Sequence, residues 1–223
     1  MAKILITGGR NGLGKAIANA LLAADHEVHC YDIEDDSDVL EPNLYGLKEL
    51  DILINCAGVN KIAWLEDITD KDWDSVMGVN AKGIFKMSQH CLPMLKESKG
   101  TILNIVSNAS HMPMTCSLVY NASKGAADIM TRQLARELTK AHDITVFGIS
   151  PNKLSGTEMS KAIDESVPEI RGWSAEYAEE RQKAGLLLGE ETPPELVAEF
   201  IAYLLQDKQH HRFLSGTIIP YGA

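Results

Sequence analysis

The sequence has few cysteines, few aromatic residues and too little basic charge for a nucleic-acid-binding protein. Its 223 residues include four cysteines and 6% aromatic residues, and 31 Asp and Glu outnumber 21 Lys and Arg for a formal charge of −10. A surface that follows nucleic-acid phosphates or anionic lipids needs an excess of positive charge, so we exclude both as partners. The cysteines, at positions 30, 56, 91 and 116, match neither zinc-site nor CxxC spacing. We therefore expect reduced thiols and no bound metal, as is usual in the cytoplasm.

Long hydrophobic runs are also missing. A membrane-spanning helix needs roughly 20 apolar residues, and the opening MAKILITGG is too short in its apolar part for a signal peptide. We expect a cytoplasmic protein without a membrane partner. The 45% hydrophobic content is enough for a globular core, and at roughly 100–200 residues per domain we expect residues 1–223 to form a single domain.

Short apolar runs alternate with longer amphipathic stretches along the chain. The runs have the length and composition of parallel strands that are buried on both faces, and the stretches have helical periodicity. We predict strands near residues 3–7, 27–32, 51–55, 100–107, 144–150 and 216–220, and helices near 13–24, 72–96, 119–140, 158–183 and 194–205. This order predicts an α/β fold, a doubly wound parallel sheet of six or seven strands flanked by helices.

The segment 33–50 is short for such a fold. It contains an acidic run between Glu34 and Glu41 and has room for about one helical turn over 44–50. We expect that one strand at the sheet edge is missing or reduced to residues 37–40.

The first predicted strand leads into a glycine-rich turn and then into an alanine-rich helix. Gly8 suits a tight turn, Gly12 would let a pyrophosphate approach the backbone, and Gly14 would allow close helix–strand packing. The GxxxGxG spacing differs from the GxGxxG of many dinucleotide sites, and glycine turns after strands also occur for structural reasons alone.

The second predicted strand ends at Asp32, where a dinucleotide-binding fold places the group that contacts the adenosine ribose. A carboxylate there accepts hydrogen bonds from the ribose hydroxyls and repels a 2′-phosphate, so we predict NAD(H) as cofactor, with NADP(H) disfavoured. Arg10 is the opposing feature, because a guanidinium in the glycine turn can pair with a 2′-phosphate. Alternatively, Arg10 stacks on the adenine or lies in solvent.

Tyr120 and Lys124 lie four residues apart at the start of a predicted helix and therefore share one helix face. Lowering the pKa of a phenol from about 10 by ~3 units requires roughly 4 kcal/mol of phenolate stabilisation. A neighbouring ammonium and a cationic nicotinamide ring are able to supply it. Ser107 ends a predicted strand, at the edge of a parallel sheet where ligands bind. Each of these features is also common in unrelated proteins.

Taken together, the motifs resemble the short-chain dehydrogenase/reductase family, the Tyr-dependent oxidoreductases. They occur in family order over nearly the whole chain: TGGRNGLG at 7–14, Asp32, NCAG at 55–58, VNAKG at 79–83, Ser107, YNASK at 120–124, SPN at 150–152 and TPPELVAEFIAYLL at 192–205. The resemblance implies a Rossmann-like fold and hydride transfer between a nicotinamide cofactor and a secondary alcohol or ketone. Two other readings are a catalytically silent dinucleotide sensor, suggested by the short segment 33–50, and a sugar-nucleotide epimerase, for which the chain is short.

The resemblance also implies roles for individual residues. Tyr120 would exchange a proton with the substrate, Ser107 would hold the substrate oxygen, and Lys124 would bind the nicotinamide ribose and lower the Tyr120 pKa. Asn80 would hold a water through its backbone carbonyl. His111, Met112 and Met114 follow Ser107 in the loop before the predicted helix and would lie in the pocket wall, with His111 either a substrate contact or a surface loop residue. The implied cofactor contacts are Gly8, Arg10, Asn11, Gly12, Leu13, Gly14, Asp32, Ile33, Asn55, Ala57, Gly58, Tyr120, Lys124, Pro151 and Thr157.

Three departures from the family pattern stand out. The short segment leaves only Asp35, Asp36 and Asp38 as candidates for the adenine contact. Asn152 replaces a usual glycine after Pro151, in a turn that Asn tolerates well. The chain ends in Tyr-Gly-Ala where the family usually has Asp-Gly-Gly.

The segment 153–191 corresponds to the family's substrate lid. Residues 158–191 hold nine acidic and four basic residues, which disfavours strongly anionic substrates unless the charge simply faces water. The helices predicted at 72–96 and 119–140 carry apolar residues on more than one side, and the resemblance implies that they join subunits into a homodimer or homotetramer. The apolar residues in question are Ile84, Phe85, Met87, Cys91, Ile129 and Met130.

Overall fold

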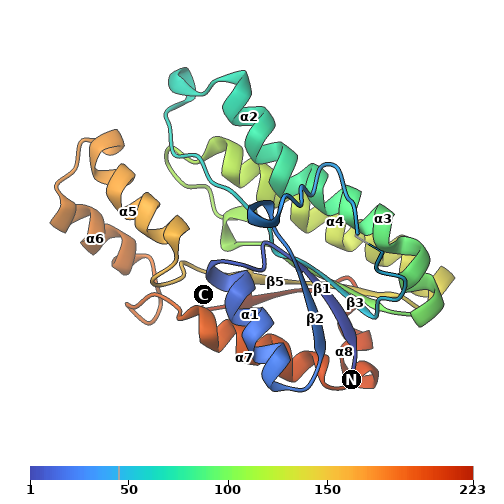
Figure 1. Cartoon of the computed structure of the whole chain (residues 1–223). Helices are drawn as coiled ribbons and strands as arrows, with labels where there is room; N and C mark the ends of the chain where they lie inside the picture. Colours follow the sequence, from blue (N-terminus) through green and yellow to red (C-terminus); the bar gives the residue numbers. More distant parts are fainter. Residues whose placement is uncertain (45, 223) are drawn as a thin grey trace.

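The computed structural model, which describes residues 1–44 and 46–222, contains a six-stranded parallel sheet (Figure 1). The strand order is β2-β1-β3-β4-β5-β6, so the chain starts one strand in from an edge, forms that edge with β2 and then returns to build the sheet toward the other edge. The strands are β1 Lys3–Thr7, β2 Glu27–Tyr31, β3 Ile52–Asn55, β4 Thr101–Ile105, β5 Thr145–Pro151 and β6 Ile218–Tyr221. This confirms the predicted doubly wound α/β fold, with six strands and not seven.

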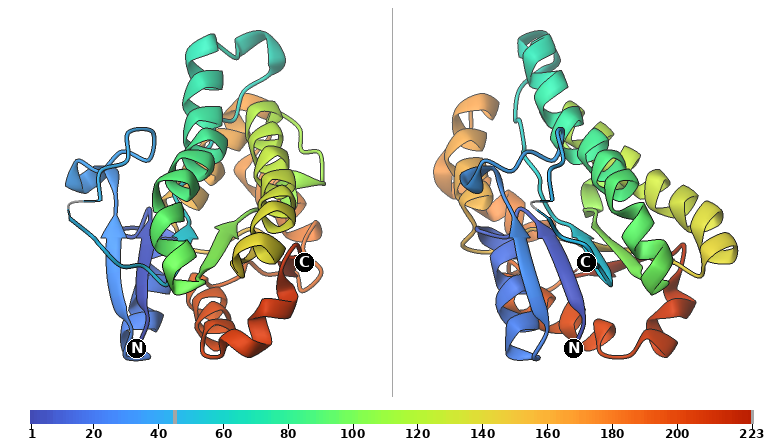
Figure 2. Two further views of the ribbon diagram at one scale, coloured as in Figure 1. Left: turned by 90° about the vertical axis from the view of Figure 1, so that its right-hand side faces the viewer. Right: turned by 45° about the vertical axis from the view of Figure 1, so that its right-hand side comes forward.

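Helices cover both faces of the sheet (Figures 1 and 2). They are α1 Gly12–Ala23, α2 Asp70–Met77, α3 Gly83–Ser98, α4 Leu118–His142, α5 Glu158–Arg171, α6 Ala175–Ala184, α7 Pro194–Leu205 and α8 Lys208–His211. Side chains alternate across β1, so Ile4 and Ile6 pack against α1 and α7, whereas Leu5 faces α3 and α4. Each face thus has its own buried core, which explains why the strands read as continuous apolar runs.

Two predicted helices differ from the structure. The helix predicted at 72–96 is interrupted by a π-helical turn, Gly78–Lys82, between α2 and α3. The helix predicted at 158–183 is broken into α5 and α6, because Gly172 ends α5 in the left-handed conformation and Ser174 caps α6. These two helices, which lie in the segment predicted to be a substrate lid, stand away from the sheet at its upper left in Figure 1.

The segment between β2 and β3 forms neither a strand nor a helix of normal length. It begins with a 3-10 helix, Ile33–Asp35, and the described residues 37–40 are not a strand, so β2 is the sheet edge. The helical turn predicted at 44–50 is not present among the described residues; a hydrogen bond from Leu47 N to Leu44 O closes a turn there, and position 45 lies outside the described residues.

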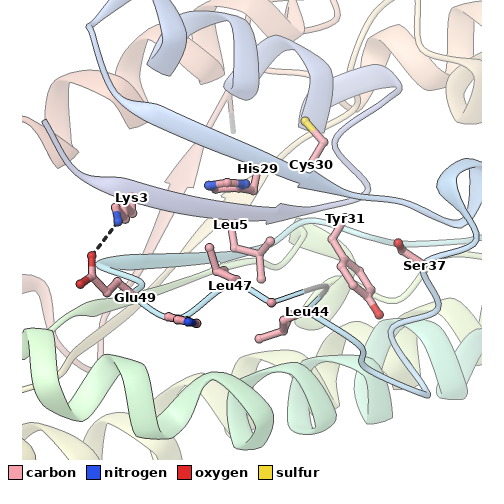
Figure 3. Close-up of a pocket in the computed structure, with 11 residues that line it drawn as sticks. Lys3, Leu5, His29, Cys30, Tyr31, Ser37, Leu44, Leu47 and Glu49 are labelled. Atoms are coloured by element: carbon pink, nitrogen blue, oxygen red, sulfur yellow. Dashed lines mark hydrogen bonds and ion pairs between the residues drawn. The ribbon is translucent and has the colours of Figure 1, made fainter.

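A cavity of about 530 Å³ lies where this short segment crosses the sheet (Figure 3). Leu5 and Tyr31 of the sheet face Leu44 and Leu47 across it, and the Lys3–Glu49 ion pair lies at one end. None of the predicted catalytic or cofactor residues is among its described lining residues. Among the described residues, moreover, no helix could cross a membrane and no cluster of side chains could hold a metal ion.

Candidate functional site

The glycine turn joins β1 to α1 at the carboxyl edge of the sheet. Gly8 has φ +68°, and a Cβ there would lie 2.8 Å from Ala57 Cα; a Cβ on Gly14 would lie 2.0 Å from the Gly8 carbonyl oxygen. Both positions therefore need glycine. Thr7 Oγ1 accepts hydrogen bonds from the backbone N–H groups of Cys56 and Ala57, each at 3.0 Å, and ties this turn to the end of β3.

The amino end of α1 is shaped to receive an anion. Asn11 occupies the N-cap position, yet its side chain does not cap the helix; it donates to Glu34 Oε1 at 2.7 Å instead. The first-turn N–H groups, starting at Gly12 with φ +48°, are thus left without a side-chain acceptor in the described part of the chain. A pyrophosphate fits this arrangement of glycine backbone and helix dipole.

Asp32 and Arg10 lie side by side, in an arrangement that the sequence alone did not predict. Asp32 is buried, and its carboxylate accepts from Arg10 N at 2.9 Å and from Glu34 N at 3.2 Å. The Arg10 side chain is exposed to solvent, as one of the two alternatives predicted, and its guanidinium also makes a bidentate ion pair with Asp35, at 2.7 and 3.1 Å. Asp35, which was a candidate for the adenine contact, is engaged by Arg10.

Asn55 has its side chain directed into the protein. Its Nδ2 donates to Asn104 Oδ1 at 2.8 Å, and Asn104 Nδ2 donates to Thr131 Oγ1 of α4 at 2.9 Å. This buried polar chain connects β3, β4 and α4 at the site edge, while Asn55 Oδ1 has no hydrogen-bond partner among the described residues. Asn104 interrupts an apolar strand, TILNI, and that is the signal by which the sequence could have revealed it.

Gly58 lies close to two of the predicted catalytic residues, Asn80 and Lys124. A Cβ at Gly58 would lie 3.4 Å from Asn80 Oδ1 and 3.8 Å from Lys124 Nζ. Cys56, two residues earlier, is close enough to Lys124 for their charges to interact, but burial raises the pKa of its thiol to about 12. Cys56 is therefore a neutral thiol near neutral pH and not a nucleophile.

Lys124 is buried beside Tyr120, as the four-residue spacing predicts. Lys124 is 5% exposed, and its Nζ lies 5.8 Å from the centre of the Tyr120 ring. Nζ donates a hydrogen bond to the Ile105 carbonyl at 3.0 Å. Burial lowers the pKa of Lys124 from 10.5 to about 8, because the ammonium loses hydration that one carbonyl does not replace. This lysine is therefore able to gain and lose a proton near neutral pH.

Two opposing effects act on the pKa of the Tyr120 phenol. Burial raises its pKa above 10, and a hydrogen bond with the Ser107 hydroxyl lowers it, with burial the larger effect. The protein's own groups thus do not produce the lowering expected from the sequence. Ser107 caps the 3-10 helix Asn108–Ser110, accepting from Ala109 N at 3.2 Å, which fixes its hydroxyl at the end of β4.

Asn80 lies in the π-helical turn, fully buried. Its Oδ1 accepts from Val59 N, and its Nδ2 donates to Val59 O and to Ser123 Oγ, all at 2.9 Å. Ser123 Oγ in turn donates to the Tyr120 carbonyl at 2.8 Å. The side chain is therefore committed to holding the loop after β3 against α4, so any contact with water falls to the backbone. Ser123 was not singled out from the sequence, although it lies inside the YNASK motif.

Asn121, the residue after Tyr120, holds the loop before α4 in place through hydrogen bonds. Asn121 Nδ2 donates to Ala109 O and Met112 O, both at 2.7 Å. His111 lies exposed on this loop, and Met114 lines an apolar cavity of about 330 Å³ together with Trp64 and residues of the same loop.

The predicted lid segment contacts the glycine turn at one end and the loop after β3 at the other. A Cβ on Gly12 would lie 3.6 Å from Thr157, whose hydroxyl caps α5 by accepting from Ser160 N at 3.1 Å. Trp64 Nε1 donates to the Ile170 carbonyl of α5 at 2.9 Å. The segment 151–157 therefore lies over the glycine turn, and α5 reaches the loop after β3.

Asn152 replaces a usual glycine, but it does not adopt the left-handed conformation: its φ is not positive. β5 continues through Pro151, and the Asn152 side chain stabilises the turn by donating to Gly222 O at 3.0 Å and accepting from Asn108 Nδ2 at 2.6 Å.

Comparisons with known proteins agree with this geometry. The family model described as short chain dehydrogenase matches residues 35–168. A 3-oxoacyl acyl-carrier-protein reductase from Thermotoga maritima is 30% identical over 82% of this chain and 68% of its own length. The 2,3-dihydro-2,3-dihydroxybenzoate dehydrogenase of Escherichia coli is 25% identical over 99% of this chain and 96% of its own. The crystal structure of a 3-ketoacyl-(acyl-carrier-protein) reductase from Brucella melitensis, complexed with NADH, superposes with a TM-score of 0.82 at 22% identity, covering 98% of this chain and 96% of its own.

The fold and the glycine turn are those of a dinucleotide-binding α/β protein, and the relatives are oxidoreductases. The chain belongs to the short-chain dehydrogenase family.

Proposed function

We propose that the protein is an NAD(H)-dependent oxidoreductase that interconverts a secondary alcohol and a ketone. The observation that carries the proposal is the placement of Tyr120 and Lys124 on one face of α4, at the same sheet edge as the open amino end of α1. Both catalytic side chains are present and aligned, which favours turnover over a silent dinucleotide sensor.

The bound nicotinamide would supply or accept the hydride at the face that Tyr120 presents. Ser107 holds the substrate oxygen through its hydroxyl and stabilises the charge that develops there. Tyr120 donates the proton to that oxygen during reduction and accepts it during oxidation. Because burial raises the pKa of Tyr120, this step relies on nearby positive charge to stabilise the phenolate.

Lys124 has two roles in this proposal. Its ammonium binds the nicotinamide ribose and, 5.8 Å from the Tyr120 ring centre, favours the phenolate form. Its pKa of about 8 also allows it to pass a proton onward near neutral pH. A water on the backbone carbonyl of Asn80 would connect this path to solvent.

The cofactor preference follows from Asp32. Its buried carboxylate keeps acceptor capacity for the ribose hydroxyls beyond the two backbone groups it already binds, and it opposes a 2′-phosphate. The remaining contacts would come from the glycine turn, Ile33, the backbone of residues 55–58 and the segment from Pro151 to Thr157. We expect a lower dissociation constant for NAD(H) than for NADP(H).

The substrate is proposed to be uncharged or weakly charged. The lid segment 158–191 has a net charge of −5, and the loop beside Tyr120 carries Met112 and Met114. An acidic lid disfavours acidic substrates and carrier proteins, whereas methionines suit apolar ones.

A panel assay tests the proposed activity. Oxidation of NADH is measured with ketones, ketosugars and acyl thioester analogues, and reduction of NAD⁺ with the matching alcohols. We expect turnover with a neutral, apolar ketone and little with strongly anionic compounds. Tight NAD(H) binding with no turnover across the panel would instead favour the sensor.

We also propose a homodimer or homotetramer built on α3 and α4. Ile84, Met87 and Cys91 turn out to be buried in the core, but Phe85 and Ile129 are 48% and 61% exposed. Light scattering at micromolar concentration is expected to show an oligomer, and the double substitution F85D/I129D is expected to give a folded monomer, because it places charge on this apolar surface. A monomeric wild type would contradict the proposal.

A further inference from the structure

We propose that Asp35 is a specificity-determining residue: it holds the Arg10 guanidinium out of reach of a 2′-phosphate and so maintains the selection of NAD(H). This inference rests on the proposed function, because it concerns the adenosine end of the same cofactor site.

Arg10 would otherwise favour NADP(H). It lies within the glycine turn, and its backbone N–H donates to Asp32 at 2.9 Å. The Arg10 side chain therefore leaves the backbone beside the Asp32 carboxylate, which would face the adenosine ribose. A 2′-phosphate on that ribose would lie within the same region. Arginine binds phosphate with paired, charge-assisted hydrogen bonds.

Asp35 uses that same paired geometry. Its two oxygens accept from Arg10 Nε at 2.7 Å and from Nη2 at 3.1 Å, so one of the two paired donor edges of the guanidinium is occupied and its charge is compensated. Both side chains are partly exposed, so the ion pair is a competitor for the guanidinium and not a rigid barrier.

The turn that presents Asp35 is held in place by the glycine loop itself. Asp32 caps the 3-10 helix Ile33–Asp35, and Glu34 accepts from Asn11 Nδ2 at 2.7 Å. Asp36 ends the helix in the left-handed conformation, with φ +56°. To bind at the occupied edge of the guanidinium, a 2′-phosphate would therefore have to break two hydrogen bonds to Arg10 and would leave the Asp35 charge beside its own.

The substitution D35N tests this role, because asparagine keeps the size and removes the charge. Dissociation constants are measured by calorimetry for NAD⁺ and NADP⁺, and also for 5′-AMP and 2′,5′-ADP, which differ in the 2′-phosphate and require no chemistry. We expect D35N to shift the preference toward the 2′-phosphorylated member of each pair by at least tenfold, with little change for NAD⁺.

Two further variants isolate the mechanism. E34Q removes the same charge one residue away without touching Arg10, and it is expected to shift the preference far less. R10Q/D35N is expected to lose the gain, because the freed guanidinium is its source. The inference is overturned if D35N shifts the preference no more than E34Q does, or if the gain survives in R10Q/D35N. A wild type that binds none of the four nucleotides would instead contradict the proposed function.

Discussion

Replacing Tyr120 with phenylalanine is expected to lower turnover by roughly 10³- to 10⁴-fold while NADH still binds. Phenylalanine keeps the ring that packs beside Lys124, 5.8 Å from its Nζ, but removes the hydroxyl that we propose exchanges a proton with a substrate held by Ser107. The effect should therefore fall on kcat and leave the dissociation constant of NADH close to that of the wild type.

The measurement compares steady-state turnover with NADH binding by fluorescence, on the same Y120F protein. The substitution Y177F serves as the control, because Tyr177 is an exposed residue of the lid helix α6. Turnover in Y120F at the level of Y177F would show that another group moves the proton and would remove Tyr120 from the mechanism.

Replacing Lys124 with methionine is expected to abolish turnover and, at the same time, to make the protein more stable near neutral pH. Lys124 is 5% exposed, and its pKa is lowered from 10.5 to about 8 by burial. At about 1.4 kcal/mol per pKa unit, the buried charge costs about 3 kcal/mol of folding free energy at pH 7. Methionine removes that cost but also the hydrogen bond to the Ile105 carbonyl, so we expect a net gain of about 1–2 kcal/mol.

The stability gain from K124M is lost at high pH. Because the folded state holds the Lys124 proton less tightly than the unfolded state does, the cost is fully present below pH 8. The cost shrinks as the pH rises from about 8 through 10.5, and above 10.5 the amine is mostly neutral in both states. K124M should thus be more stable than the wild type at pH 7 and no more stable at pH 10.

Urea unfolding of both proteins at the two pH values checks this prediction. The difference between them isolates Lys124, since the other titrating groups are common to both. A K124M protein that is less stable than the wild type by the same amount at both pH values would mean that Lys124 is not a destabilising buried charge.

The sheet was predictable because its strands are buried on both faces. In β1, successive side chains face opposite cores, so Ile4, Leu5 and Ile6 form one apolar run in the sequence. The predicted bounds of this strand therefore agree with the observed ones. The break between α5 and α6 was missed by the predicted helix 158–183, although Gly172 and Ser174 are a typical helix stop and start. The π-helical turn Gly78–Lys82 was not predicted either, because poor helix formers such as Gly78, Val79 and Asn80 within a helical pattern do not by themselves specify a π-turn.

The site was predictable where one motif fixes the geometry. Four-residue spacing brings Tyr120 and Lys124 together on any helix, and glycine is the one residue that fits at Gly8 and Gly14. Interactions between distant segments were not predictable in the same way. Arg10 and Asp35 were each singled out from the sequence, but their pairing depends on the path of a three-residue 3-10 helix that no local pattern specifies.

The most direct test of the central claim is the transfer of deuterium from NADH labelled at nicotinamide C4 to the best ketone of the panel, followed by mass spectrometry of the product. We predict that the wild type places deuterium on the carbinol carbon and that Y120F does so at a rate lower by roughly three orders of magnitude. Absence of label in every product, or equal labelling by wild type and Y120F, would contradict the assignment of this protein as a Tyr120-dependent oxidoreductase.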